Sequence, residues 1–344
     1  MSFFAFGIGI GTQSSNGDWL EVYYNQPLLN PPTALIDAVG QCIGYEAGTD
    51  AAIEICQAQL KDLQKALLEI DDREQIAVVE ALRGSTQPMV VTLLATDSAP
   101  ASTPEAYLKL TLLSSRLVQP HAIDLTGQFA LLPNVAWTSE GAVSLEDLPK
   151  RQLAARAAGR ILDVLSVDKF PKMSNYVVPT GIRIGDASRV RLGAHVGEGT
   201  TVMHEGFINF NAGTLGVSMI EGRISAGVVI GNGTDIGGSA STMGTLSGGN
   251  NVVISVGENC LLGANAGTGI PLGDRCTIEA GLYVTAGAKV SILDENNKQL
   301  CKVKASELAG KSDLLFRRNS QTGRIEVKTN QSAIELNEAL HKHN

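Results

Sequence analysis

Cysteine is scarce in this sequence, and its spacing is irregular. The chain has 344 residues and five cysteines, none in a CxxC pair: Cys42, Cys56, Cys260, Cys276 and Cys301. An odd number of scattered cysteines excludes a disulfide framework of the kind that holds small secreted domains together. We therefore expect reduced thiols and a cytoplasmic protein.

Long apolar runs and strong charge are also missing. The apolar N-terminus lacks the basic segment of a signal peptide, and no later run is long enough to span a bilayer. Charged residues make up 18% of the chain, and the formal net charge is −8. This charge repels nucleic acid and anionic membranes, so we expect neither as a partner.

The remaining composition is that of a globular protein with several parts. Hydrophobic residues reach 44%, enough for a sizeable core in a chain of this length. Changes in pattern predict an α+β N-terminal domain over 1–110 and a helical linker region over 111–175. They also predict a repeat domain over 176–290 and a β-rich cap with a helix over 291–344.

Local patterns assign elements within the first two parts. "WLEVYYN" and "PMVVTLLAT" predict strands, because they are rich in β-branched and aromatic residues. "TALIDAVGQCIG" and "AAIEICQAQLKDLQKALLEI" have apolar residues at helical spacing. "PEAYLKLTLLSSRLV" and "LEDLPKRQLAARAAGRILDVLSV" also predict helices.

Between Val178 and Val290 the pattern changes to a period of six. Most of the chain's 37 glycines lie there, and aliphatic residues recur at every sixth position: Val178, Ile184, Val190, Val196, Val202, Ile208, then Ile220 after a break at Thr214. A six-residue period is typical of hexapeptide-repeat β-helices, in which three hexads form one triangular coil. Coils stack about 4.8 Å apart. The irregular stretch between Ile236 and Val256 predicts a projecting loop.

Five motifs within this region resemble tetrahydrodipicolinate N-succinyltransferases of diaminopimelate and lysine biosynthesis. They are "DKFPKMSNYVVPTGIRI", "VRLGAHVGEGTTVMHEGFINFNAGTLG", "MIEGRISAGVVIG", "MGTLSGG" and "LLGANAGTGIPLGD". The N-terminal part is similar to the longer branch of that family. The resemblance implies a left-handed parallel β-helix, a homotrimer with sites between neighbouring columns, and succinyl-CoA as acyl donor.

The implied reaction moves a succinyl group to the amino group of hydrated or ring-opened tetrahydrodipicolinate. The products are N-succinyl-2-amino-6-oxopimelate and CoA. Two alternatives remain open at this point: an N-acetyltransferase acting on the same or a related amine, and a trimeric scaffold without catalytic activity.

Glu205 is the candidate catalytic residue. In the family pattern the glutamate of "MHEGF" accepts the acyl group as an anhydride, and a general-base role suits the same carboxylate equally well. Neighbouring side chains on a flat strand point in opposite directions, so His204 is expected to be structural unless the backbone bends there.

Other site residues are assigned through the same motifs. Phe207, Asn211 and Arg223 are assigned to the substrate, and Arg183, Arg189 and Arg191 are further candidates for its carboxylates. The groups expected to border CoA are small residues and lysines: Gly222, Ser225, Gly248, Gly263, Ala264, Lys289, Lys302 and Lys304. Small residues admit a thin pantetheine chain, and lysines can meet phosphates.

A metal site cannot be assigned from the residues. The resemblance adds an expectation of Mg²⁺ at the trimer interface, although no acidic ligand set can be mapped onto this chain. A zinc site of the trimeric carbonic anhydrase type needs three converging histidines. His195 and His204 have no third histidine near them in the sequence.

Overall fold

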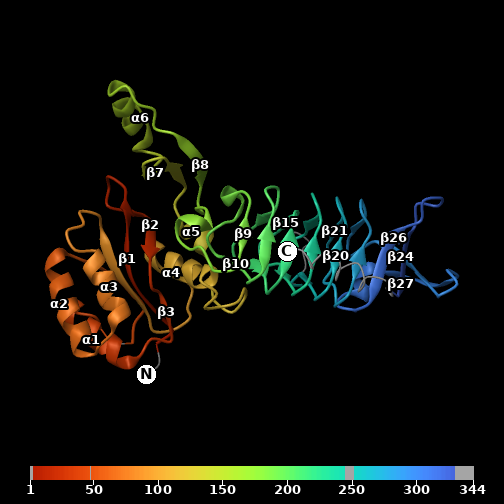
Figure 1. Cartoon of the computed structure of the whole chain (residues 1–344), viewed down its shortest axis with the longest axis horizontal. Coiled ribbons are helices and arrows are strands. Elements are labelled where there is room, and N and C mark those ends of the chain that lie inside the picture. Colours follow the sequence, from red (N-terminus) through yellow and green to blue (C-terminus); the bar gives the residue numbers. More distant parts are fainter. Residues whose placement is uncertain (1–2, 47, 245–251, 330–344) are drawn as a thin grey trace. The chain divides into compact units, whose positions relative to one another are not determined.

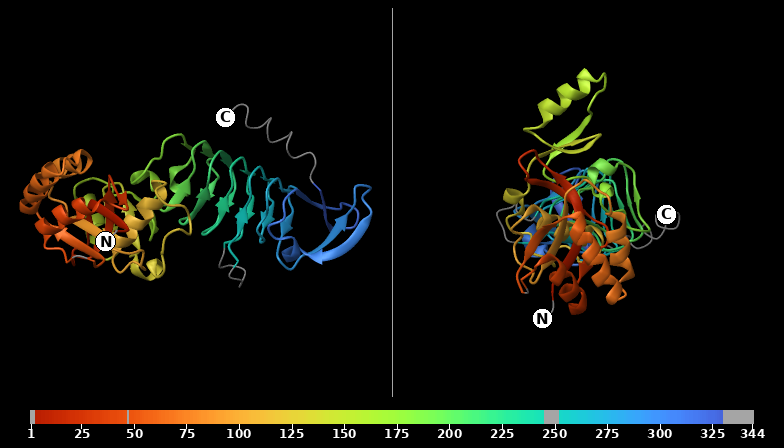
Figure 2. Two further views of the ribbon diagram at one scale, coloured as in Figure 1. Left: turned by 90° about the horizontal axis from the view of Figure 1, so that it is seen from below. Right: turned by 90° about the vertical axis from the view of Figure 1, so that its left-hand side faces the viewer.

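The computed structural model describes residues 3–46, 48–244 and 252–329 (Figures 1 and 2). Its contacts divide the chain into two units. The first comprises Met1–Leu112 and Ala122–Pro171, and the second comprises Leu113–His121 and Lys172–Asn344. All five cysteines are unpaired.

The first unit is built around an antiparallel sheet with the order β2-β1-β5-β4, and β3 pairs with β1. Its strands are β1 (Ala5–Gln13), β2 (Trp19–Tyr24), β3 (Leu28–Leu29), β4 (Ala51–Ile55) and β5 (Met89–Leu94). Every residue of β5 is buried. The predicted strands at β2 and β5 are confirmed.

Helices cover both faces of this sheet. α1 (Thr33–Ile43), α2 (Gln57–Glu69) and α3 (Arg73–Ala81) share one core with Phe6 and Ile8 of β1. The opposite face meets α4 (Thr103–Ser114), because a side chain at Gly7 would contact Tyr24 and Leu108. The prediction of continuous helix from residue 51 is wrong, since the first five residues form β4.

A smaller sheet completes the first unit, with the order β7-β6-β8. The strands of this sheet are β6 (Val135–Thr138), β7 (Gly141–Ser144) and β8 (Val164–Asp168). The helix α5 (Gln128–Leu131) precedes them in the chain, and α6 (Leu148–Ala157) lies between β7 and β8. The sequence predicted helix through Val167, but α6 ends at Ala157. Gly159 follows with a φ of +71°, a conformation that terminates helices, and the chain then becomes a strand.

In the second unit the chain passes through three parallel sheets in turn, and we call this region the column (Figure 1). The first sheet holds β10 (Ala194–Val196), β13 (Ala212–Thr214), β16 (Val229–Ile230) and β19 (Ser255–Val256). The second holds β9 (Arg183–Ile184), β11 (Thr200–Val202), β14 (Ser218–Ile220), β17 (Asp235–Ile236), β20 (Leu261–Leu262) and β22 (Thr277–Ile278). The third holds β12 (Phe207–Ile208), β15 (Arg223–Ile224), β18 (Ser241–Thr242), β21 (Gly267–Thr268) and β23 (Tyr283–Val284). Two 3-10 turns, η1 (Met173–Asn175) and η2 (Ala187–Arg189), lie near its start.

From Ile184 onward the hexad residues form the interior of the column. The prediction is wrong for Val178, which is 68% exposed because it precedes β9, the first strand of the column. Val202 pairs with Ile220, and Ile220 pairs with Ile236, all of them buried. The next partner of Ile236 is Leu262, so the coil between them holds the extra residues of the predicted projecting loop. Residues 245–251 of that loop lie outside the described residues.

Three inward positions carry threonine instead of an aliphatic residue. Thr214, Thr242 and Thr268 are at most 1% exposed, and each hydroxyl has a hydrogen-bond partner. A buried hydroxyl is tolerated when it is bonded in this way. The break noted at Thr214 is therefore a substitution within the repeat and not a change of fold.

The C-terminal cap extends the second sheet of the column. β26 (Leu314–Arg318) pairs with β22, and β27 (Ile325–Thr329) continues to β24 (Lys289–Leu293) and β25 (Gln299–Lys304). The 3-10 turn η3 (Ala305–Leu308) links β25 to β26. Strands dominate the described part of the predicted cap. The helix predicted at 331–343 lies outside the described residues. None of the described helices combines the length and apolarity needed to cross a membrane.

Candidate active site

One edge of the column collects four of the predicted site residues. This edge, which we call the site edge, consists of the successive turns between the second and third sheets, at residues 203–206, 221–222, 237–240, 263–266 and 279–282. Glu205, Gly222, Gly263 and Ala264 all lie in these turns. Residues from different motifs therefore follow one line along the column.

Glu205 projects from the first of these turns. The N–H of Gly206 donates to the carbonyl oxygen of Met203 at 2.8 Å and closes the turn. The Glu205 side chain is 66% exposed, and its Oε1 lies 3.9 Å from Nε2 of His204. The two residues occupy a bend and not a flat strand, so both side chains reach solvent on the same edge.

Phe207 and Arg223 lie beside the site edge on the outer face of the third sheet, where they are direct partners in neighbouring strands. The guanidinium of Arg191 stands 5.9 Å from the centre of the Phe207 ring. Both Nε and Nη2 of Arg223 donate to Oγ of Ser241, at 3.2 and 2.8 Å. The structure thus groups Glu205, Phe207 and Arg223 around one end of this face.

A hollow opens on the third sheet next to Arg223. It is lined by Arg223, Ser225, Ala226, Ser241, Thr242, Met243, Gly244 and Tyr283. The sequence reasoning missed Ser241 and Tyr283. A signal for them existed, since both stand immediately before an inward hexad residue, as Phe207 and Arg223 do.

A second, apolar pocket shares Met243 and Gly244 with this hollow. Its other lining residues are Val252, Ile254, Gly269, Ile270, Pro271, Thr285, Ala286, Gly287, Ser306 and Ala309. The hollow beside Arg223 and the apolar pocket therefore adjoin at Met243 and Gly244. This arrangement suits a ligand with a polar end and a thin apolar arm.

Several of the small residues assigned to CoA also have structural roles. A Cβ at Gly222 would lie 2.4 Å from the carbonyl oxygen of Ala240, so the stacking of coils itself requires glycine there. Ser225 uses its hydroxyl to donate to the carbonyl oxygen of Thr242 at 2.6 Å. Ala264 is exposed on the site edge. Gly248 lies outside the described residues.

Asn211 lies away from the site edge, in the turn between the third and first sheets. It has a φ of +50°, and its side-chain oxygen accepts a hydrogen bond from the N–H of His121 at 2.8 Å. This contact anchors the segment Leu113–His121 to the column. The structure does not bring Asn211 together with Glu205 on one edge.

Three lysines assigned to CoA converge in the cap. Lys289 of β24 is the direct antiparallel partner of Lys304 of β25, and Lys302 pairs with Ser291 on the same side of the strands. All three lysines are exposed. They form a local cationic surface on a chain whose net charge is negative.

A metal centre is not evident among the described residues. Across residues 3–46, 48–244 and 252–329, no group of three or more His, Cys, Asp or Glu side chains is placed to hold an ion. The structure of one copy therefore does not support the expected Mg²⁺.

Comparison with known proteins identifies the family. The family description "Tetrahydrodipicolinate N-succinyltransferase middle" matches residues 132–172, and "Hexapeptide repeat of succinyl-transferase" matches residues 253–286. A 2,3,4,5-tetrahydropyridine-2,6-dicarboxylate N-succinyltransferase from Pseudomonas putida is 62% identical over 341 residues, which cover 99% of this chain and 98% of that protein. The chain belongs to the tetrahydrodipicolinate N-succinyltransferase family.

Other relatives of this succinyltransferase agree. The enzyme of the same name from Vibrio cholerae is 58% identical over 344 residues, the whole of both chains. A Campylobacter jejuni crystal structure, provisionally assigned as a 2,3,4,5-tetrahydropyridine-2-carboxylate N-succinyltransferase, superposes with a TM-score of 0.87 at 32% identity. That match covers 96% of this chain and 93% of the other. The predicted family, acyltransferase class and hexapeptide repeat are confirmed.

Proposed function

We propose that this succinyltransferase moves the succinyl group of succinyl-CoA to the amino group of hydrated or ring-opened tetrahydrodipicolinate. The products are N-succinyl-2-amino-6-oxopimelate and CoA, within diaminopimelate and lysine biosynthesis. The observation that carries the proposal is that Glu205, Gly222, Gly263 and Ala264 lie along one edge of the column, in a chain whose full-length relatives are named as N-succinyltransferases.

Donor choice tests the proposal directly. Initial rates are measured with succinyl-CoA and with acetyl-CoA at equal concentrations, and the product mass is read for each. We expect a large preference for succinyl-CoA, because Arg223 offers a cation to a terminal carboxylate that acetyl-CoA lacks. Equal or better use of acetyl-CoA would favour the N-acetyltransferase alternative.

Two routes are open to Glu205. In the first, its carboxylate attacks the thioester carbonyl, a mixed anhydride forms, and the C–S bond breaks to release CoA thiolate, which takes a proton from solvent. The acceptor amine then attacks the anhydride, loses a proton and regenerates the carboxylate. In the second, the amine attacks the thioester directly while Glu205 removes its proton.

A rapid-quench experiment without acceptor separates these routes. The anhydride route predicts stoichiometric release of CoA and a protein heavier by one succinyl group, and Glu205→Gln should abolish both. The general-base route predicts no CoA release until the acceptor is added.

CoA is proposed to lie along the site edge, beside Gly222, Ser225, Gly263 and Ala264, with its phosphates near the cap lysines. Replacing Lys302 and Lys304 together by Ala should raise KM for succinyl-CoA roughly 10-fold or more, because charge-assisted phosphate contacts are lost. The KM for succinyl-pantetheine, which lacks the nucleotide phosphates, should not change. An equal effect on both donors would place the phosphates elsewhere.

The finer architecture also belongs to this proposal. We propose a left-handed parallel β-helix and a homotrimer in which each site lies between the site edge of one column and a neighbouring copy. Glu205 and Ala264 on the site edge are exposed in one copy, which is consistent with a shared site. Sedimentation equilibrium of the full chain tests the trimer, and an experimental structure tests the handedness. The cytoplasmic location stays a prediction.

A further inference from the structure

Arg189 contacts the backbone of the turn that carries Glu205. Its Nη2 donates to the carbonyl oxygen of Glu205 at 2.9 Å, and its Nε donates to the carbonyl oxygen of Gly206 at 3.1 Å. One planar guanidinium therefore holds two successive peptide groups. Because Arg presents its donors in a fixed fork, this contact restrains orientation as well as distance.

The position of Arg189 is itself fixed by the preceding coil. Arg189 ends η2, which Asp186 caps by accepting from the N–H of Ser188 at 2.9 Å and from its hydroxyl at 2.6 Å. The next residue, Val190, is fully buried and bridges to Ile208 in the third sheet. The backbone of Arg189 is therefore held in place directly beside Phe207.

Tight stacking holds the same turn from below and above. A Cβ at Gly185 would lie 2.8 Å from the backbone nitrogen of His204, and a Cβ at Gly206 would lie 2.2 Å from the carbonyl oxygen of Ile220. The backbone of the turn therefore has little freedom on its inner side. On its outer side, the Arg189 fork supplies the restraint.

The contacts of Arg189 also argue against a role in binding substrate. A carboxylate is recognised best when two N–H groups on one edge of a guanidinium face it. Here the edge formed by Nε and Nη2 already faces protein carbonyls. Arg223 differs, because it is exposed, borders the hollow and gives its donors to a single hydroxyl.

We propose that Arg189 is a positioning residue, which fixes the Glu205 turn so that the carboxylate reaches the reacting group, and that it does not bind substrate. This inference rests on the proposed function of Glu205. A shift of about 1 Å in a reacting group can reduce turnover about 100-fold. Loss of the fork therefore acts on the chemical step and leaves substrate affinity intact.

The test compares steady-state kinetics of the wild type with Arg189→Met and Arg189→Lys. We expect Arg189→Met to lower kcat roughly 10- to 100-fold. KM for succinyl-CoA and for the acceptor should stay within about threefold. Added guanidinium ion should restore part of kcat, and Arg189→Lys should retain more than Arg189→Met, since an ammonium group still donates to a carbonyl.

The double variant Arg189→Met/Glu205→Ala makes the inference specific to Glu205. Its residual turnover should equal that of Glu205→Ala alone, because the turn then carries no reacting group. Arg73→Met is the matched control: Arg73 pairs with Asp71 on the surface of the first unit, and wild-type kinetics are expected. Thermal unfolding of each variant establishes that the fold is intact.

The contrary outcomes are distinct. A rise in acceptor KM at constant kcat would make Arg189 a substrate ligand and overturn the inference. Wild-type kcat in Arg189→Met, with Glu205→Ala inactive, would also overturn it and leave the proposed function standing. Full activity of Glu205→Ala would remove Glu205 from the reaction and overturn both.

Discussion

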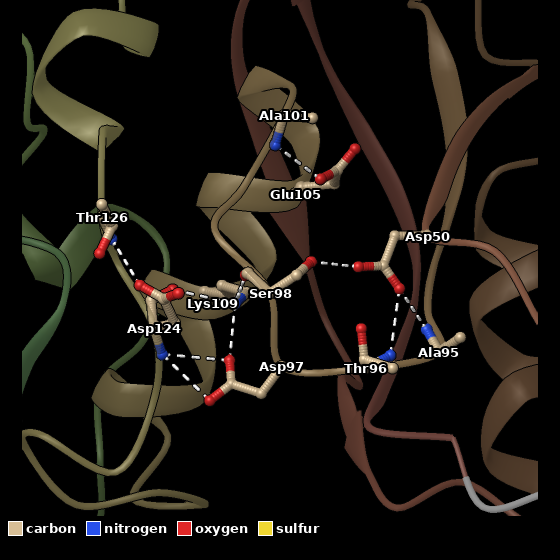
Figure 3. A network of polar contacts seen from close by, with 10 residues as sticks. All are labelled: Asp50, Ala95, Thr96, Asp97, Ser98, Ala101, Glu105, Lys109, Asp124 and Thr126. Carbon is tan, nitrogen blue, oxygen red and sulfur yellow. Dashed lines mark hydrogen bonds and ion pairs between the residues drawn. The ribbon is translucent and has the colours of Figure 1, made fainter.

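Substitution of Lys109 tests quantitatively how much its buried polar contacts stabilise the first unit. Its side chain is 0% exposed, and Nζ donates to Oδ1 of Asp97 at 2.7 Å, to the carbonyl oxygen of Asp124 at 2.9 Å and to that of Ser98 (Figure 3). Both oxygens of Asp97 also accept from the N–H of Asp124 at 3.1 Å. Removing the ammonium group would leave a carboxylate and two carbonyls without their shared donor.

We expect Lys109→Met to lower the free energy of unfolding of the first unit by about 3 kcal/mol, the lower end of the range for breaking a buried ion pair. The lower end applies because Asp97 is 30% exposed and water can partly replace the lysine. Urea unfolding followed by tryptophan fluorescence measures this unit selectively, since Trp19 and Trp137 are the chain's two tryptophans and both lie in it. Lys65→Met is the control, because Lys65 is exposed on the outer face of α2, and we expect a change within about 0.5 kcal/mol.

A double-mutant cycle with Asp97→Leu isolates the pair. Because the lysine and aspartate share one network, the two single effects should exceed the effect of the double variant by roughly 1 to 3 kcal/mol. Single effects that add within about 0.5 kcal/mol would show that the network does not stabilise the unit as described.

Three further predictions follow from particular residues. Burial lowers the pKa of His195 below its ordinary 6.5, so the unfolded chain binds a proton at this residue at a higher pH than the folded chain does. The stability that neutral His195 contributes is therefore complete above about pH 6.5 and is lost as the pH falls. His195→Gln should therefore flatten the decline in unfolding free energy between about pH 7 and pH 5, and an unchanged slope would contradict it. Two backbone N–H groups at the start of α2 lower the pKa of the Cys56 thiol, whereas burial raises the pKa of the Cys42 thiol. Mass spectrometry after iodoacetamide treatment should therefore show that Cys56 is alkylated before Cys42. The reverse order would refute this prediction. Gly206→Ala should cost about 1 to 3 kcal/mol and reduce turnover, because its Cβ would strike the Ile220 carbonyl; a variant with wild-type melting and rate would show that the turn adapts freely.

The repeat could be predicted from the sequence because each inward position is stabilised in the same way, by burial of an apolar side chain. Burial of an aliphatic side chain at every sixth residue specifies the column regardless of distant contacts. The exceptions arise where another interaction satisfies the same position. Thr214, Thr242 and Thr268 are buried because their hydroxyls are hydrogen bonded, which hydrophobic periodicity does not report.

Errors in the first unit occurred where local propensity and tertiary context disagree. Ala51–Ile55 and Val164–Asp168 are short segments next to strong helical patterns, and their pairing with β5 and β6 decides their conformation. Pairing with a distant strand overrides local preference. No local pattern in the sequence contains that information.

The candidate site was predictable in its residues more than in its arrangement. Family motifs pointed to Glu205 and Arg223, and the register of the column explains why they lie close together. The contact between Arg189 and the Glu205 turn was not predictable, because it depends on how one coil stacks on the next. The sequence placed Arg189 among the candidate substrate ligands, whereas the structure directs its guanidinium to the backbone.

Turnover of Glu205→Gln is the most direct test of the central claim, that a carboxylate on the site edge performs acyl transfer. The matched control is Glu198→Gln, since Glu198 is an exposed carboxylate in a turn on a different edge of the column. We expect kcat with succinyl-CoA to fall about 100-fold or more for Glu205→Gln, with unchanged CoA affinity, and to stay at the wild-type value for Glu198→Gln. Equal turnover in the two variants would contradict the account.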